Sequence, residues 1–300
     1  MIELLSLTVL FLSVSGFFYN KWWGFAAAGL FRLQYLFLSF LGIAAGFYYS
    51  MPLIIIINAF SFAVNFYIIS DWLPNLLKKQ ADNIDVASIN SWSKNHKPYK
   101  LSKYVTKFQP EVLLLMEVTD KLKRDCADIF NAYPYNMSHN VRDGFEIWLL
   151  SKNPMCDTEV YNLGEGDTPL LSCKINLRGR EYRIFSAHPR PAINSHYAEA
   201  RHTYFESFKK IILKEKDPII VLGDFNSVPW EAHFSLFLEE TKLISTLITC
   251  GYRITWPTYF LPFGIPMDHI LVSDSISVNG VCVGPNVGSD HYPVGMGIDD

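Results

Sequence analysis

The pattern of hydrophobic and polar residues divides the chain into two parts. Before about residue 72 long apolar runs dominate, and charged side chains occur at only four positions: Glu3, Lys21, Arg32 and Asp71. From Ile84 onward, short apolar runs alternate with amphipathic ones. The first pattern is typical of membrane helices and the second of a folded α/β domain. We therefore place a membrane anchor at residues 1–74 and a second domain at residues 75–300.

Three apolar stretches in the first part are close to the ~20 residues that a helix needs to cross a bilayer. They run over residues 2–19, 33–49 and 53–69. They predict three transmembrane helices, the second and third joined by a tight turn. A signal peptide is the alternative for the first stretch. A membrane helix is the better interpretation, because the stretch has no basic segment before it and no small-x-small cleavage site.

Basic residues indicate how these helices are oriented. Lys21 and Arg32 lie in the first connection, and Lys78 and Lys79 follow the third stretch, so with three crossings both pairs share one side of the membrane. Basic flanks favour the cytoplasmic side. This predicts a multi-pass protein of the inner (cytoplasmic) membrane with its second domain in the cytoplasm. The five widely spaced cysteines agree, because they form neither a disulfide framework nor a CxxC zinc motif.

The second domain has the pattern of a mixed α/β fold. Runs of aliphatic residues predict strands at 86–90, 112–116, 145–151, 170–177, 182–187, 219–222, 270–272 and 277–283. Amphipathic segments predict helices at 99–108, 119–130 and 195–215. Strands outnumber helices and occur in hairpin-like pairs, which is why we expect a mixed sheet.

The segment IIVLGDFN, from Ile219 to Asn226, is the most informative of these runs. Four aliphatic residues predict a strand buried on both faces, and Gly223 ends it. Because side chains alternate along an extended chain, Asp224 and Asn226 point to the same side and can meet one ligand. The alternative is an Asx turn that only closes a core strand.

Other predicted strands also begin or end on polar residues that suit a hard cation. Asn90, Glu117 and His188 each follow a strand, while Asp268 and the pair Asp290–His291 each precede one. Carboxylates, carboxamides and histidines without cysteine favour Mg²⁺ or Mn²⁺ beside a phosphate, and not a thiolate zinc site. The net charge of −3 argues against nucleic-acid binding through a basic surface, although it allows a nuclease that neutralises phosphate with a metal.

Five short motifs resemble a known superfamily. MEV, SAHP, GDFNSVPW, MDHILVS and GSDHYPV, in this order and spacing, resemble the endonuclease/exonuclease/phosphatase superfamily from about residue 86 to residue 296. The hydrophobic helices, FRLQYL and RITWPTYF look most like its bacterial membrane-anchored branch. The resemblance implies a four-layer α/β sandwich, with two packed mixed β-sheets flanked by helices, and a phosphoester hydrolase that depends on Mg²⁺ or Mn²⁺.

The resemblance also implies metal ligands and residues that handle water. Glu117 would be the principal metal ligand, with Asn90 and Asp290 near the same cation. Asp224 would orient or deprotonate the attacking water, and Asn226 would hold that water or a phosphate oxygen.

The remaining implied roles concern the phosphate. His291, polarised by Asp268, would contact the scissile phosphate, and His188 would bind another phosphate oxygen. Glu146 stands where deoxyribonuclease-like members carry a carboxylate that pairs with the histidine matching His188. Met116 departs from the pattern, since the superfamily usually has Gln at that position.

Two residues close to these motifs have plainer interpretations. His269 follows Asp268 directly, so on a strand it points to the opposite face and we expect it in the core. Arg201 lies on the predicted long helix, where a salt bridge on a solvated face is favoured over a role in the site.

The sequence therefore predicts a membrane-anchored, divalent-metal-dependent phosphoester hydrolase of the phosphodiesterase, nuclease or lipid/inositol phosphatase type. Its substrate would be a nucleic acid or the head group of a phospholipid or inositol phosphate. The membrane is the other expected partner, and no protein partner is inferred. The alternative is a membrane-tethered interaction module with an inactive hydrolase fold. The complete polar set disfavours it, because a binding module needs no water-activating carboxylate.

Overall fold

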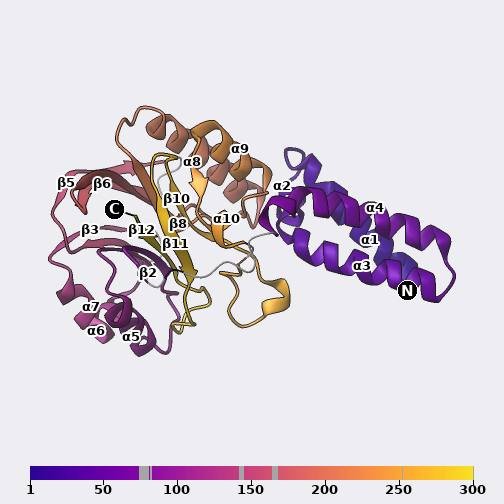
Figure 1. Ribbon diagram of the computed structural model, residues 1–300, viewed down its shortest axis with the longest axis horizontal. Helices are drawn as coiled ribbons and strands as arrows, with labels where there is room; N and C mark the ends of the chain where they lie inside the picture. Colours follow the sequence, from indigo (N-terminus) through magenta and orange to yellow (C-terminus); the bar gives the residue numbers. More distant parts are fainter. Residues whose placement is uncertain (74–80, 82, 142–144, 164–167, 252, 300) are drawn as a thin grey trace.

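The computed structural model consists of a helical bundle joined to an α/β domain (Figure 1). It describes residues 1–73, 81, 83–141, 145–163, 168–251 and 253–299. Lys78 and Lys79, which contributed to the predicted orientation, lie outside the described residues.

The bundle is built from three longer helices and short helical turns. Its elements are α1 (Ile2–Ser15), η1 (Gly16–Phe18), α2 (Trp23–Ala28), η2 (Gly29–Phe31), α3 (Arg32–Tyr48), α4 (Pro52–Ile69) and η3 (Ser70–Trp72). Pro52 begins α4, where its fixed φ suits a helix and its missing N–H costs no hydrogen bond. The N-terminus lies at the end of the bundle away from the α/β domain (Figure 1), and α1, α3 and α4 pack along one another.

Two of the described helices, not the three that the sequence predicted, are long and apolar enough to cross a membrane. They are Trp23–Tyr48, with 26 residues, and Pro52–Trp72, with 21. The first apolar helix, Ile2–Phe18, is shorter than these because a turn follows Phe18. The prediction of three membrane-spanning helices is corrected accordingly.

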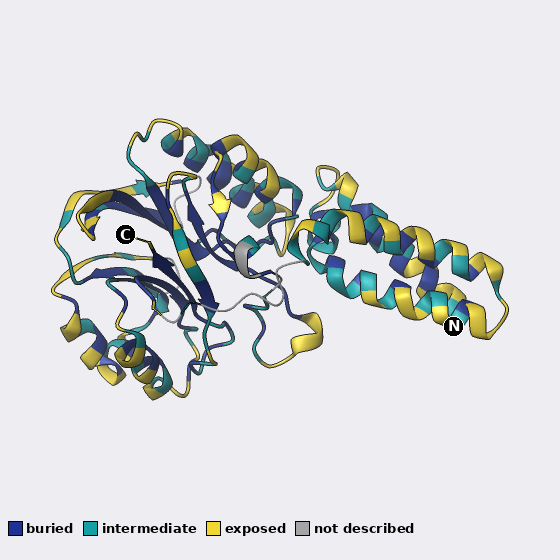
Figure 2. Ribbon diagram, viewed as in Figure 1, coloured by how far each residue is buried: buried dark blue, intermediate teal, exposed yellow. Residues whose placement is uncertain are grey.

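Polar side chains lie inside the bundle and apolar ones outside. Asn58 Nδ2 donates to Ser6 Oγ, and Asn65 Nδ2 donates to Ser13 Oγ, each at 2.8 Å, and all four residues are buried. The seven-residue spacing places both pairs on the same face of α1 and of α4, two turns apart. Figure 2 shows many exposed positions along the bundle helices. The large apolar side chains exposed there include Leu4, Phe37, Phe40, Ile56 and Phe60.

The α/β domain contains two six-stranded sheets, with strand orders β11-β12-β1-β2-β4-β3 and β5-β6-β7-β8-β10-β9. The first sheet comprises β1 (Val86–Asn90), β2 (Val112–Val118), β3 (Tyr135–Asn140), β4 (Glu146–Ser151), β11 (Val278–Val283) and β12 (Val294–Ile298). The second comprises β5 (Met155–Asn162), β6 (Pro169–Leu177), β7 (Arg180–Ala187), β8 (Ile219–Asp224), β9 (Ile244–Ser245) and β10 (Asp268–Val272). Strands β1 and β2 pair in parallel, as do β7 and β8, and the other described pairs are antiparallel.

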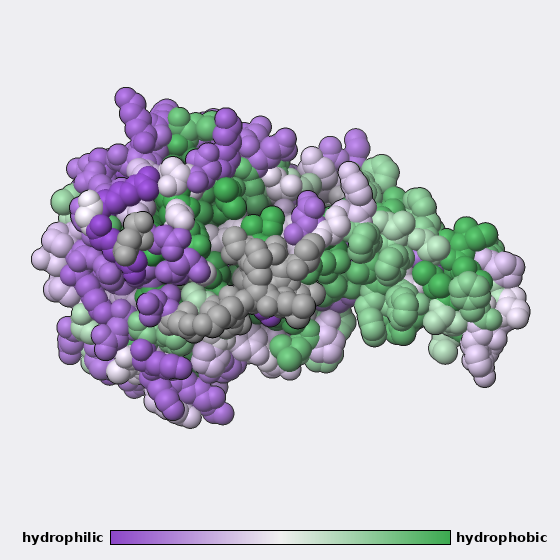
Figure 3. Space-filling model, in the orientation of Figure 1, coloured by the Kyte–Doolittle hydropathy of each residue, from purple (hydrophilic) through white to green (hydrophobic). Residues whose placement is uncertain are grey.

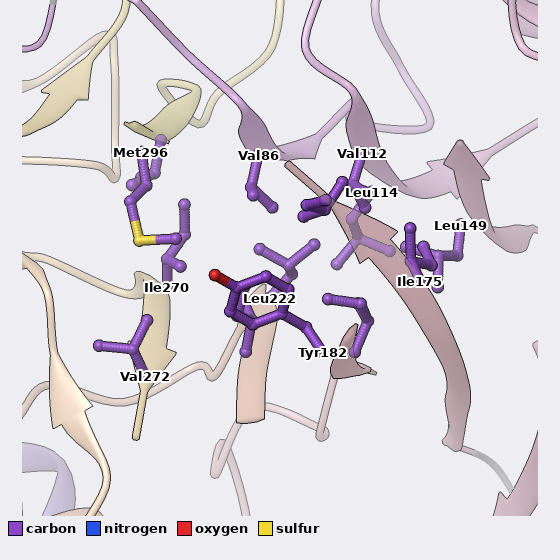
Figure 4. Close-up of a cluster of buried hydrophobic side chains, with 14 of the residues drawn as sticks. Val86, Val112, Leu114, Leu149, Ile175, Tyr182, Leu222, Ile270, Val272 and Met296 are labelled. Carbon is purple, nitrogen blue, oxygen red and sulfur yellow. The ribbon is translucent and has the colours of Figure 1, made fainter. Parts of the chain in front are cut away.

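The two sheets pack face to face around an apolar core (Figure 4). Val112 and Leu114 reach it from the first sheet, and Leu222 and Ile270 reach it from the second. Residues two apart on a strand share a face, so each buried strand sends one set of side chains here and the other set toward the helices. The first sheet is covered by α5 (Tyr99–Phe108), α6 (Asp120–Asp125) and α7 (Ala127–Ala132), and the second by α8 (Ser195–Ile212) and α9 (Ala232–Thr241). The α/β sandwich of two packed mixed sheets flanked by helices is confirmed.

Some elements differ from the sequence prediction. The single helix expected at 119–130 is divided into α6 and α7 at Cys126, whose ψ of 35° is not helical. Strands β3 and β5 were not expected. Both lie at sheet edges and are mostly exposed, so they lack the buried alternation that marks a strand in a sequence. Helix α9 was also missed, and short elements α10 (Leu247–Cys250) and η4 (Leu261–Phe263) complete the chain.

Candidate active site

The polar residues at the strand ends meet at one edge of the two packed sheets. The parallel pairs β1/β2 and β7/β8 each bring two carboxyl ends to this edge. Strand β10 runs antiparallel to β8, so its amino end reaches the same edge, and Asp268 is paired directly with Asp224. Strand β12 likewise runs antiparallel to β1, so this topology explains why residues at the carboxyl ends of four strands lie together with residues at the amino ends of β10 and β12.

Glu117 leaves β2 in a conformation that is unusual for a residue with a side chain. Its φ is +55°, and the pairing of β2 with β4 shifts register between Leu115 and Val118. Such bulges redirect a side chain, and strained residues of this kind are concentrated at functional sites. The Glu117 carboxylate accepts hydrogen bonds from Asn90 Nδ2 at 3.1 Å and from the Ser93 backbone N–H at 3.0 Å.

Asn90 connects the two sheets at this edge. Its Oδ1 accepts from the Trp92 N–H at 3.0 Å, which leaves Nδ2 to face the carboxylates. Nδ2 lies 3.1 Å from Glu117 Oε1 and 3.2 Å from Asp224 Oδ2. One amide nitrogen therefore reaches a carboxylate from each sheet, and the two acids share one site.

Asp224 is buried at the end of β8 and also forms the Asx turn considered for this segment. Its Oδ1 accepts from the Asn226 N–H at 2.8 Å, and Asn226 has a φ of +48°. The Asx turn, the alternative interpretation of the segment, is therefore observed. A side chain at Gly223 would come within 2.0 Å of the Ala187 carbonyl oxygen, so only glycine fits where β7 and β8 approach.

Asn226 points its amide nitrogen away from the carboxylates. Nδ2 donates to the Pro189 carbonyl at 3.0 Å, which fixes the segment that follows His188. His188 Nε2 lies 3.7 Å from Asp224 Oδ2. The hydrogen bond therefore couples the position of His188 to the turn that carries Asp224.

His291 lies between two buried carboxylates. Its Nδ1 is 2.8 Å from Asp268 Oδ2, and its Nε2 is 3.7 Å from Asp224 Oδ2. The Asp268 backbone N–H donates to Thr255 Oγ1 at 3.0 Å, and the His291 N–H donates to Ser289 Oγ at 3.0 Å. Hydrogen bonds from their backbone N–H groups thus fix the positions of both Asp268 and His291.

The electrostatics of this pair favour a protonated histidine. Burial by itself lowers the pKa of His291, but the Asp268 and Asp224 carboxylates outweigh burial and raise that pKa to about 10. Burial raises the pKa of the Asp268 carboxyl to about 6, against the opposing effect of His291. Because the histidine holds its proton more tightly than the aspartate does, the pair is an imidazolium and a carboxylate at neutral pH.

Two groups of residues at this edge have the composition of a cation site. In the first, Asp224, Asp268 and His291 each offer one ligand atom, and these atoms lie within 4.8 Å of one another. In the second, Asp290 faces Glu117. Burial, together with Glu117, raises the pKa of Asp290, and its buried Oδ1 has no hydrogen-bond partner among the described residues.

Glu146 does not join the other predicted residues. Its carboxylate accepts hydrogen bonds from Lys123 Nζ at 3.0 and 3.1 Å and from Trp148 Nε1. His188 is not among its described partners, so the expected pairing is not seen. Glu146 begins β4 beside Val118 of β2, where Lys123 and Trp148 hold its carboxylate.

Arg201 is a residue that the sequence interpretation placed wrongly. It is 4% exposed, where a solvated salt bridge was expected, and its Nη1 donates to the Asn226 carbonyl oxygen. Its Nη2 lies 3.8 Å from Glu231, the residue that caps α9. Arg201 therefore supports the Asp224–Asn226 turn from α8.

Other residues support the site, and two of them, Thr255 and Ser289, were not singled out from the sequence. Thr255 and Ser289 fix Asp268 and His291, Trp256 Nε1 lies 3.4 Å from Asp290 Oδ2, and Met116 Sδ accepts from the Asp224 N–H at 3.3 Å. Met116 thus contacts the site from the position where the superfamily usually has Gln. For Thr255 and Ser289, the only signal in the sequence was that they lie within or close to the recognised motifs.

Comparison with solved structures supports the fold. D. rerio TDP2, solved with a single-strand DNA product, has a TM-score of 0.60 at 14% identity, covering 73% of this chain and 100% of that one. The human Nocturnin catalytic domain, with bound sulfate, gives 0.57 at 16% identity, covering 76% and 100%. The 3′ phosphatase NExo from Neisseria, bound to a product DNA hairpin, gives 0.58 at 16% identity, covering 72% and 99%.

Comparison of the sequence with protein-family models identifies the family to which the chain belongs. No curated protein matches the sequence. The model of the Endonuclease/Exonuclease/phosphatase family matches residues 87–291, which is more than half of the chain and extends from β1 to His291. By this match, and by the sandwich and strand-edge site that accompany it, the chain belongs to the Endonuclease/Exonuclease/phosphatase family.

Proposed function

We propose that this protein is a membrane-anchored, divalent-cation-dependent phosphoester hydrolase. The observation that carries the proposal is the buried Asp268–His291 ion pair beside Asp224, which Asn90 links to Glu117. This arrangement offers a proton acceptor for water, a positively charged donor for phosphate and an acidic site for a cation within one edge. Hydrolysis of a phosphoester needs all three.

Of the two candidate cation sites, the pair Glu117 and Asp290 suits the cation better than the group of Asp224, Asp268 and His291. Metal ligands must be deprotonated, and His291 holds a proton between Asp268 and Asp224. Glu117 and Asp290 are both carboxylates, Glu117 disfavours the charge of Asp290, and Asp290 Oδ1 is buried without a described partner. A Mg²⁺ or Mn²⁺ ion there, with Asn90 beside it, would relieve this repulsion and would neutralise charge on the phosphate.

The other residues would act on water and on the phosphate oxygens. Asp224 would accept a proton from the attacking water, whose oxygen bonds to phosphorus while the ester oxygen leaves and takes up a proton. His291 Nε2–H would donate to a phosphate oxygen, and His188 would contact another. Asn226 has committed Nδ2 to Pro189, which leaves its Oδ1 to accept a hydrogen from the water.

The anchor proposal rests on the inverted polarity of the bundle. Residues 1–73, the described part of the anchor, carry apolar side chains on the outside and hydrogen-bonded polar pairs inside, which suits lipid and not water. The helices Trp23–Tyr48 and Pro52–Trp72 would cross the inner membrane. Lys21, exposed at the end of the bundle that meets the α/β domain, favours a cytoplasmic position for residues 75–300.

The family and the site leave the substrate open between nucleic acids and phospholipid or inositol phosphate head groups. Two solved relatives carry DNA products, but each is only 14–16% identical to this chain. A tethered interaction module remains the competing function. It would bind without turnover, so an assay with a generic phosphodiester separates the two.

The test uses the purified full chain in detergent with bis-p-nitrophenyl phosphate. We expect product release with Mg²⁺ or Mn²⁺, none with EDTA, and none from Asp224→Ala or His291→Ala. Asp274→Ala and His139→Ala, in the exposed turn before β11 and on edge strand β3, are the matched controls and should retain activity. A folded wild-type protein with no turnover of any phosphoester would favour the interaction module.

A further inference from the structure

The segment that follows Trp256 exposes an unusual run of large apolar side chains. Tyr259, Phe260, Leu261 and Phe263 are between 50% and 72% exposed. The whole stretch from Ile254 to Met267 contains no charged residue. Single exposed apolar residues are ordinary, but a contiguous set of this kind marks an interaction surface. We call residues 259–263 the apolar loop.

The apolar loop lies at the base of the helical bundle. The rings of Phe263 and Phe31 are 6.1 Å apart, and Gln34 Nε2 donates to the Gly264 carbonyl at 3.0 Å. The loop projects near the start of α3 (Figure 1), and Figure 3 shows that the outer surface of the bundle is largely apolar. Through Phe31 and Gln34 the loop therefore adjoins the end of the anchor that meets the α/β domain.

Tryptophans also lie where the helical bundle meets the α/β domain. Trp72 and Trp230 pack edge to face at 6.1 Å, Trp230 Nε1 donates to the Leu30 carbonyl at 3.3 Å, and Trp22 packs against Trp23. Trp and Tyr concentrate where a bilayer meets water. The junction of bundle and α/β domain thus has the composition of an interfacial layer, and the apolar loop lies in it.

The segment that leads into the apolar loop is hydrogen-bonded to the active site. The Thr258 N–H donates to the Asp290 carbonyl and Thr258 Oγ1 donates to the Ser289 carbonyl, both at 2.9 Å. The Tyr292 N–H donates to the Thr255 carbonyl at 2.7 Å, and the ring of Trp256 lies 6.4 Å from that of His291. The segment that carries the loop therefore holds Asp290 and His291 from both sides.

We propose that the apolar loop inserts into the interfacial layer of the bilayer and that the substrate is a lipid phosphoester in that bilayer. This inference rests on the proposed hydrolase function and names its substrate class. A site held by a segment whose loop lies in the membrane surface meets phosphates at head-group depth. The loop is uncharged, whereas a protein that follows a nucleic-acid backbone needs basic contacts along it.

The reaction that follows is a simple hydrolysis. The oxygen of water bonds to the lipid phosphorus, one phosphorus–oxygen ester bond breaks, and the released ester oxygen takes up a proton. A phosphodiester lipid gives a phosphomonoester and an alcohol, and no oxidant or second substrate is consumed.

The experiment uses the full chain reconstituted in vesicles of phosphatidylcholine and phosphatidylglycerol with Mg²⁺. The variant is Phe260→Ser with Leu261→Ser, and the matched control is Leu213→Ser, which changes an exposed apolar residue at the end of α8. Lipid hydrolysis is followed by ³¹P NMR, and hydrolysis of bis-p-nitrophenyl phosphate is measured in parallel. We expect the double variant to lose at least tenfold in lipid turnover while its turnover of the soluble substrate stays within twofold, and Leu213→Ser to change neither.

Three results would overturn the inference in distinguishable ways. Lipid turnover that is equal in wild type and double variant removes the role of the loop. Cleavage of an oligonucleotide but not of lipid, with the soluble substrate still hydrolysed, assigns the site to nucleic acid. Absence of all phosphoester turnover in the wild type removes the proposed function as well.

Insertion is measured separately from activity. A spin label at Leu261→Cys, in a Cys156→Ser background because Cys156 is exposed, should collide more with oxygen than with a water-soluble nickel complex. The same label at Leu213→Cys should show the opposite. A label at position 261 that collides more with the nickel complex than with oxygen would overturn insertion, even if lipid hydrolysis were observed.

Discussion

His291 Nδ1 lies 2.8 Å from Asp268 Oδ2, and both side chains are buried. An aspartate in this position fixes the tautomer and orientation of the ring and stabilises its protonated form. The hydrogen-bond donor that faces Asp224 and a bound phosphate is therefore Nε2–H. The account of the site depends on this geometry.

Replacing Asp268 with Asn should remove the charge that keeps His291 protonated. We expect Asp268→Asn to lower kcat by roughly 10²–10⁴-fold, with a smaller change in KM, because the donor acts mainly in the transition state. Steady-state kinetics with bis-p-nitrophenyl phosphate measure this. Asp274→Asn is the control, and a kcat for Asp268→Asn within threefold of wild type would show that the pair has no catalytic role.

Glu117 should determine metal affinity. We expect Glu117→Gln to raise the Mg²⁺ concentration for half-maximal activity by at least about tenfold, because it removes a charged ligand from the proposed site. Calorimetric titration with Mn²⁺ gives a reading that is independent of turnover. Glu111→Gln, just before β2 at the opposite end of that strand, is the matched control. Equal metal requirements in both variants and wild type would place the cation elsewhere.

Arg201 should act by positioning the turn between Asp224 and Asn226. Lysine keeps the charge but cannot reproduce the guanidinium geometry, so Arg201→Lys should lower kcat by about 10- to 100-fold through misplacement of the turn. The measurement is kcat together with the thermal midpoint. Arg180→Lys, on the exposed start of β7, should behave as wild type. If Arg201→Lys lost stability but kept kcat, its role would be structural only.

His269 should make stability depend on pH between about 6.5 and 4. It is fully buried in the core, as expected, and its Nε2 lies 3.0 Å from the Pro266 carbonyl. Burial lowers its pKa from 6.5 to about 4, so its neutral form stabilises the fold above pH 6.5 and this contribution is lost as the pH falls to 4.

The thermal midpoint of the full chain in detergent should therefore fall more between pH 7 and pH 5 than that of His269→Asn. The raised pKa of Asp268, about 6, acts in the opposite sense in both proteins, so the difference between them isolates His269. The linkage corresponds to at most about 3 kcal/mol over the whole window. His269→Asn should have a lower midpoint at pH 7 and a shallower dependence. Parallel curves for the two proteins would contradict the buried neutral state.

The two polar pairs of the bundle should contribute unequally. Asn65 Oδ1 also accepts from Arg32 at 3.3 Å, whereas Asn58 bonds Ser6 and the Ile54 carbonyl. Asn58→Leu should cost about 0.6–2 kcal/mol, typical of an interhelical hydrogen bond, and Asn65→Leu should cost more because it also leaves a buried guanidinium less satisfied. Thermal midpoints in the same detergent compare them. A larger loss in Asn58→Leu would contradict this ranking.

Much of the candidate site could be predicted because its residues follow strands. The strand at Val86–Asn90 and the helix at Tyr99–Phe108 have the predicted bounds, and Asn90, Glu117 and Asp224 lie together as residues at neighbouring strand ends should. Local alternation determines where a strand ends, and the parallel pairing of β1/β2 and β7/β8 does the rest.

The errors concern relationships that alternation cannot supply. The partners of Glu146 depend on how α6, which carries Lys123, packs beside β4, and the burial of Arg201 depends on where α9 begins. Neither is encoded within one element. The number of membrane helices was overestimated because composition shows that residues 2–19 are apolar but does not show that the helix ends at Phe18.

The central claim is that water attacks a phosphorus atom at the edge where Asp224, His291 and Glu117 meet. The direct measurement is ³¹P NMR of the product formed from bis-p-nitrophenyl phosphate in H₂¹⁸O by the full chain with Mg²⁺. The account predicts one ¹⁸O in each product phosphate from wild type and no product from Asp224→Asn. Product without ¹⁸O on phosphorus, or undiminished labelling by Asp224→Asn, would contradict it.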